Sequence, residues 1–172
     1  MPTLPGLALA ALLGATLAAC GTDPGASGAR AACGPVERER ADPSSALHLL
    51  PGAPEPAYLS DPPTSGPHRS GPPPKGVLAQ ALDRPTQVLI LEGGGVLVQH
   101  RDLPEEDLAR LSALAGDEVV VAPNPDLDAP VVATAWLAKQ RCQAVDLEAL
   151  RRFVDDHVGR GPGGAEAGEP PH

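Results

Sequence analysis

The chain has 172 residues, enough for one domain of ordinary size, and a formal net charge of −9. Its basic residues never form a block, which argues against binding to nucleic acid or to anionic lipid through a cationic surface. Glycine and proline number 19 and 22, whereas Trp, Tyr and Phe occur once each. Much of the chain is therefore turn or loop, and its small core must be built from Leu, Val and Ala.

The chain begins with an apolar run, residues 4–19, that ends in small side chains. The run is too short and too rich in Gly and Ala for a membrane span, and it predicts an export signal over residues 1–19. Its end, Leu17-Ala18-Ala19-Cys20, resembles the lipobox of bacterial lipoproteins. That resemblance implies cleavage before Cys20, a thioether-linked diacylglycerol and an amine acylated with a chain such as palmitate. The alternative is a secreted protein in which Cys20 has no such role.

Residues 20–32 predict a flexible tether, and the globular domain is expected over residues 33–160. Its N-terminal half is rich in loops, because proline and glycine are dense over residues 45–76. The last residues, 161–172, contain little that could be buried and predict a disordered tail.

The stretch QVLILEGGGVLVQH, residues 87–100, predicts a β-hairpin. Two apolar runs, residues 86–91 and 96–100, flank glycines that tolerate the positive φ of a tight turn. The glycine spacing fits neither G-x-G-x-x-G nor a P-loop, so no phosphate-binding loop is indicated. Both runs are apolar at consecutive positions, which predicts that both faces of these strands are covered.

The C-terminal half predicts two helices and two further strands. Residues 103–115 form the first helix, with Pro104 in its first turn and Gly116 as its terminator. Strands are expected over residues 118–122 and 131–137. Asp146 predicts the cap of a last helix that continues to Val158.

Two cysteines remain if Cys20 is lipidated, namely Cys33 and Cys142. An even pair in an exported protein predicts a disulfide, which would close most of the domain into one loop and stabilise it by about 4–5 kcal/mol. Two free thiols or a metal pair are the alternatives, although two sulfurs without C-x-x-C spacing make a poor zinc site.

The chain resembles the bacterial domain-of-unknown-function family numbered 3105 over residues 45–162. Four segments carry the resemblance: YLSDPPTSGPH (58–68), LEGGGVLV (91–98), VAPNPDLDAPVVATAWLAKQRC (121–142) and GRGP (159–162). It implies an exported protein, anchored to a membrane directly or by lipid, for which no activity is established.

The family pattern also includes a set of histidines around one glutamate. Carried over residue by residue, it implies a divalent transition-metal site or acid–base chemistry at His48, His68 and Glu92. Leu89 and Gly93 stand where the family has two further histidines, which implies that such chemistry is weakened or absent here. The alternative is structural: His68 hydrogen-bonds backbone in a proline-rich loop, and Glu92 orders the hairpin.

Ser65 is a candidate nucleophile, with His68 as its base. The context PTSGPH lacks the G-x-S-x-G elbow, so Thr64 and Ser65 are better interpreted as side-chain-capped turn residues.

Together these patterns predict a small α+β domain, with a β-hairpin, further strands and two helices, stapled by Cys33 and Cys142. The leading functional hypothesis is a non-enzymatic cell-envelope lipoprotein that binds a ligand or an envelope protein, or serves a structural role. It would sit outside the cytoplasm, anchored through Cys20 to the cell membrane or the outer membrane, and would need no cofactor. The alternative is a metal-binding protein or hydrolase-like enzyme using His48, His68 and Glu92.

Overall fold

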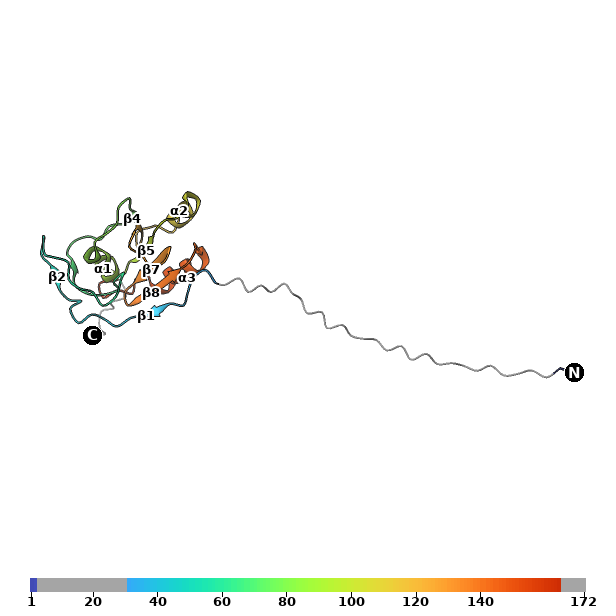
Figure 1. The fold of residues 1–172 in the computed structure, drawn as a ribbon. Coiled ribbons are helices and arrows are strands. Elements are labelled where there is room, and N and C mark those ends of the chain that lie inside the picture. The colour runs from blue at the N-terminus through green and yellow to red at the C-terminus, as the bar shows by residue number, and fades with distance from the viewer. Residues whose placement is uncertain (3–30, 165–172) are drawn as a thin grey trace. The chain divides into compact units, whose positions relative to one another are not determined.

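A computed structural model describes residues 1–2 and 31–164 of the chain (Figure 1). The chain divides into two units at residue 30, and the fold below belongs to the second. The predicted signal peptide, Cys20 and nearly all of the tether lie outside the described residues, as do residues 165–172.

The described chain is an α+β domain with three helices and two sheets, so the predicted fold class is confirmed. Its elements are, in chain order, β1 (Glu37–Arg38), β2 (His48–Leu49), β3 (His68–Arg69), β4 (Gly76–Val77), α1 (Arg84–Glu92), β5 (Val96–His100), α2 (Glu105–Ser112), β6 (Val119–Pro123), β7 (Val131–Ala135), β8 (Ala138–Cys142) and α3 (Leu147–His157).

The main sheet has six strands in the order β1-β8-β7-β5-β6-β4, and β2 pairs with β3 in a separate parallel sheet. In the main sheet β5, β6 and β4 run parallel, whereas β7 is antiparallel to β5 and forms a tight hairpin with β8. The parallel pair β5–β6 needs a crossover connection, which α2 supplies.

Helices cover both faces of this sheet, which is why its central strands are apolar at consecutive positions. Val96 and Val98 of β5 face the core made with α2 and α3, and the intervening Leu97 faces the core made with α1. The expectation that both faces of this strand are covered is confirmed.

The predicted hairpin around the three glycines is wrong, because the first of its two runs is the helix α1. Asp83 caps this helix by accepting a hydrogen bond from the Thr86 amide, and Pro85 occupies its first turn. At its end the Gly94 amide donates to Leu91 and the Gly95 amide to Ile90, with Gly94 at a φ of +85°. These two bonds form a Schellman motif, the usual way a helix stops at glycine.

Other predicted elements agree with the structure. The second apolar run is β5, α2 and α3 lie within the two predicted helices, and Asp146 caps α3 by accepting from the Ala149 amide. The predicted last strand ends earlier than expected, since Trp136 and Leu137 form the turn between β7 and β8.

The predicted disulfide between Cys33 and Cys142 is present. It ties the chain just before β1 to the end of β8, where the two cysteines also form a β-bridge. Within the described residues, none of the helices is long and apolar enough to cross a membrane.

Candidate functional site

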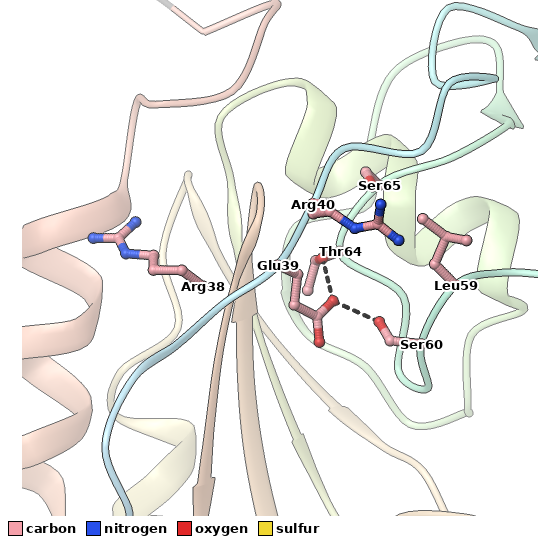
Figure 2. A pocket seen from close by; sticks show the side chains of 7 residues that line it. All are labelled: Arg38, Glu39, Arg40, Leu59, Ser60, Thr64 and Ser65. Atoms are coloured by element: carbon pink, nitrogen blue, oxygen red, sulfur yellow. Dashed lines mark hydrogen bonds between the residues drawn. The ribbon is translucent and has the colours of Figure 1, made fainter.

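The most highly organised polar cluster of the domain surrounds Lys139 on β8. This side chain is fully buried, and its ammonium lies 2.8 Å from Oε1 of Glu39, the residue that follows β1. The other carboxylate oxygen of Glu39 accepts hydrogen bonds from the hydroxyls of Ser60, at 2.5 Å, and Thr64, at 2.6 Å (Figure 2). A buried charge is costly unless it is paired, and here one carboxylate serves three donors.

These bonds fix the charge state of the carboxylate. Burial disfavours the charged form of Glu39, but the hydrogen bonds from Lys139, Ser60 and Thr64 outweigh it and lower the pKa of this carboxyl below its usual value. Glu39 is therefore an anion whose lone pairs are already engaged, which suits a structural anchor better than a general base.

The segment PPTSGPH lies against this cluster and is held on several sides. Ser65 accepts a hydrogen bond from the Asp42 amide at 2.9 Å, and the Tyr58 hydroxyl donates to the Pro67 carbonyl at 2.7 Å. Gly66 has a φ of +129°, and a Cβ there would lie 2.9 Å from the Tyr58 ring. Because of this packing, the loop presents its hydroxyls in one defined geometry.

The segment TAWLA, residues 134–138, contains a strained turn that is hydrogen-bonded to PPTSGPH. Leu137 adopts a φ of +57°, which is uncommon for a residue with a side chain. Its amide donates to the Thr64 carbonyl at 3.2 Å, and its carbonyl accepts from the Glu39 amide at 3.0 Å. Strained backbone persists where surrounding bonds over-determine it, and such places are frequently functional.

A pocket of ≈ 320 Å³ opens beside this junction. It is open to solvent on one side, and its size is at the lower end of the range for small-molecule sites. Figure 2 shows the guanidinium of Arg40 on the same side as Ser65 and Leu59, whereas the side chain of Arg38 extends the other way. Seven residues line the pocket: Arg38, Glu39, Arg40, Leu59, Ser60, Thr64 and Ser65.

The structure brings together two of the three predicted metal ligands. His48 and His68 face each other across the β2–β3 pair, with ring centroids 4.7 Å apart in an edge-to-face arrangement. Nδ1 of His68 lies 3.1 Å from the Gly66 carbonyl oxygen, which agrees with the structural interpretation of this histidine. Its Nε2 is buried and has no hydrogen-bond partner among the described residues.

Glu92 does not join these histidines in a ligand cluster. Among residues 31–164, no three His, Cys, Asp or Glu side chains are grouped so that they could hold a metal ion. Glu92 ends α1, where its carbonyl accepts from the Gly163 amide at 2.8 Å and its carboxylate lies beside that glycine. It therefore orders the chain that follows α3, and not a hairpin.

Ser65 and His68 do not form a nucleophile–base pair in the structure. The Ser65 hydroxyl is engaged with the Asp42 amide, and Nδ1 of His68 with Gly66. The interpretation of Ser65 as a turn residue agrees with this arrangement.

Sequence reasoning missed Glu39 and Lys139, the pair on which the site is built. Glu39 lies in the run VERER, whose charges are typical of a solvated surface. Lys139 offered a weak signal, because it is one of only two lysines and follows an apolar strand. Their pairing across 100 positions in the sequence depends wholly on the fold.

The family described as "Protein of unknown function (DUF3105)" matches residues 54–171 of the chain. That range contains PPTSGPH, the glycines after α1 and the β7–β8 hairpin, and it leaves out Glu39. No curated protein and no solved structure matches the chain.

Proposed function

The chain belongs to the DUF3105 family, and on that premise we propose that it is an exported, lipid-anchored protein of the bacterial cell envelope. Its role is non-enzymatic: the domain binds a small ligand or an envelope protein at the pocket beside Glu39, or supports such a partner structurally. The disulfide between Cys33 and Cys142 is the observation that carries this proposal. Disulfides persist in oxidising compartments and are rare in the cytosol, so the bond supports folding outside the cytoplasm.

The chemistry of the pocket supports binding over catalysis. The carboxylate of Glu39 is held by one ammonium and two hydroxyls, and those hydroxyls donate to it. The Ser60 and Thr64 hydroxyls are within hydrogen-bond reach of this carboxylate, but a carboxylate whose pKa is lowered by three donors is a weak base, so it is poorly suited to activate either hydroxyl.

Anchoring is tested by changing Cys20. The Cys20→Ser protein is expected to lose incorporation of radiolabelled palmitate and to move from the membrane pellet to the soluble exported fraction, since a thioether-linked lipid cannot form on serine. A Gly116→Ala protein, in which the new Cβ meets nothing within 4 Å, is the control and should keep both the label and the membrane location. Unchanged membrane retention of Cys20→Ser would reject lipid anchoring.

Metal binding is the second candidate, because Nε2 of His68 is buried beside the His48 ring and finds no hydrogen-bond partner in the described part of the chain. An imidazole nitrogen with a free lone pair is a common metal ligand. Protein purified without chelator should then carry stoichiometric zinc, copper or iron that a His68→Ala variant loses. Glu92→Gln is the informative comparison, because an effect on stability alone places Glu92 outside the metal site.

A further inference from the structure

The pocket beside Glu39 carries an excess of positive charge in a protein whose formal net charge is −9. Arg40 presents its guanidinium there, Arg38 borders the pocket with its side chain extended the other way (Figure 2), and the only lining carboxylate, that of Glu39, is neutralised by Lys139. Within residues 31–164 neither arginine has a carboxylate at ion-pair distance. Five other arginines there do have one: Arg69, Arg84, Arg110, Arg141 and Arg152.

The donors of the pocket that are free to bind a ligand lie on the side of Ser65 and Arg40. The Ser60 and Thr64 hydroxyls are used by Glu39. The Ser65 oxygen accepts from the Asp42 amide, so its own hydrogen remains available to a ligand. Arg40 lies on the side of Ser65 (Figure 2) and presents a guanidinium, whose fork of N–H groups matches the oxygens of a carboxylate or a phosphate. Asp42 is not among the residues that line the pocket, and its Oδ1 accepts from the Ser44 amide of its own turn.

One wall of the pocket is apolar. Leu59 lines it and is 59 % exposed, so its side chain is accessible to a ligand. A pocket of ≈ 320 Å³ exceeds what a bare anion fills, so carbon atoms of a ligand can cover this side chain.

We propose that this pocket binds a small oxyanion, a carboxylate or phosphate group with an attached carbon portion, through the Arg40 guanidinium and the Ser65 hydroxyl with Leu59 as the apolar wall. This inference rests on the proposed binding role and names its ligand class. A free carboxylate or phosphate metabolite and the headgroup of a phospholipid share this chemistry.

The test is a titration of the ¹⁵N-labelled full chain in non-ionic detergent, followed by NMR at constant ionic strength set with chloride. Butyrate, inorganic phosphate and glycerol phosphate are the probes, and the Arg40 Nε–Hε and Ser65 amide signals are the readout. Saturable shifts confined to the pocket are expected with at least one probe. Saturation by butyrate indicates a carboxylate ligand, and saturation by glycerol phosphate indicates a phosphate ester. In the latter case, cosedimentation of the Cys20→Ser protein with vesicles that contain phosphatidic acid, but not with phosphatidylcholine vesicles, indicates a headgroup, and no cosedimentation indicates a free ester.

Variants separate specific binding from general charge attraction. Arg40→Gln should weaken binding by at least about tenfold, since a charge-assisted fork is lost, and Ser65→Ala by a smaller factor. Arg110→Gln on α2 removes the same charge far from the pocket and should leave binding unchanged. Arg40 is exposed, so its variant should fold normally, which an unchanged melting temperature verifies.

Two results would overturn the inference: no saturable shift with any probe, or equal weakening by Arg40→Gln and Arg110→Gln. Neither of these NMR results depends on whether the protein is lipid-anchored, because anchoring is measured separately by fractionating cells that express Cys20→Ser. A soluble Cys20→Ser protein with an unresponsive pocket would leave anchoring supported and remove the ligand class.

Discussion

At the scale of single residues, the pair Glu39–Lys139 decides how this domain is assembled. The ammonium of Lys139 has no access to water, so its charge is compatible with folding only while Glu39 accepts from it. The same carboxylate gathers Ser60 and Thr64, which brings the first strand, the last strand and the PPTSGPH segment to one point. Glu39 thus holds together the segments that line the pocket.

Removing Glu39 should destabilise the domain more than removing Lys139. Glu39→Gln leaves a buried ammonium without its counter-charge and should lower the free energy of unfolding by about 3 kcal/mol or more. Lys139→Met leaves Glu39 two hydroxyl donors and partial solvent contact, so its cost should be smaller. The double variant should recover part of the loss.

Urea unfolding of the single and double variants measures these effects. Removing the exposed ion pair of α3 by Arg152→Gln is the control and should cost about 0.5 kcal/mol or less. Additive losses in the Glu39/Lys139 double variant would contradict a direct coupling of the two groups.

Acid should destabilise the domain through a second buried residue, His157. Burial lowers the pKa of this imidazole, whose Nδ1 lies 2.8 Å from the Phe153 carbonyl oxygen. The unfolded chain then binds more protons than the folded chain below about pH 6.5, so stability present at neutral pH is lost as the pH falls. The pKa of His100 is also lowered by burial and acts in the same direction.

The melting temperature should therefore fall between about pH 7.5 and about pH 5.5, and the fall should be smaller in His157→Gln. The lowered pKa of Glu39 has no effect between these pH values, because a carboxyl with a lowered pKa loses its contribution to the free energy of unfolding only below about pH 4.5. An identical fall in His157→Gln would assign the effect to other groups.

At the scale of elements, the glycines after α1 serve close packing of two backbone segments. The Gly159 amide donates to the Gly94 carbonyl, and the Gly163 amide donates to the Glu92 carbonyl, each at 2.8 Å. A Cβ on Gly161 would lie 2.4 Å from the carbonyl oxygens of Leu91 and Glu92. Residues 161–164, at the start of the predicted tail, are thus packed against the end of α1, so the prediction of disorder is wrong for these four residues.

Gly161→Ala should therefore unfold the domain at lower urea concentration, with a loss of about 1–3 kcal/mol, because the new methyl group meets rigid backbone. Gly116→Ala is the matched control, since a Cβ there meets nothing within 4 Å. It should be neutral or slightly stabilising. Equal stability of the two variants would contradict the packing account.

At the scale of the whole molecule, the disulfide closes the fold. It spans 109 positions and joins the chain just before β1, the strand at one edge of the main sheet, to the end of the neighbouring strand β8. The core that it supports is made of small aliphatic side chains, with Phe153 as the one aromatic residue fully buried in it. A cross-link over so long a loop adds to the free energy of unfolding, which a core of this size alone would leave low.

Replacing both cysteines, as Cys33→Ser with Cys142→Ser, should lower the free energy of unfolding by about 4–5 kcal/mol, because the unfolded chain regains the freedom of that loop. Non-reducing mass spectrometry of the exported protein should find the two thiols joined. Two free thiols in the mature domain, or a melting temperature unaffected by a reducing agent, would contradict this role.

The sequence alone determined the features that depend on local patterns. A continuous apolar run predicted a strand with both faces covered at β5, a further strand was predicted at β6, and caps and terminators placed α2 and α3. It also paired Cys33 with Cys142, because only two cysteines remain after Cys20. Helix α1 had readable signals, Asp83 with Pro85 at its start and glycine at its end, but a short apolar run fits a strand equally well.

Only the tertiary structure decided the site. It placed His48 beside His68 and Glu92 beside the glycines that follow α3. It also paired Glu39 with Lys139 next to a pocket that no sequence motif predicted. The physical reason is that these contacts link residues far apart in the chain, and local pattern carries no information on which distant side chains meet. Hydrogen bonds and burial between remote segments fix that choice, and they exist only once the sheet has formed.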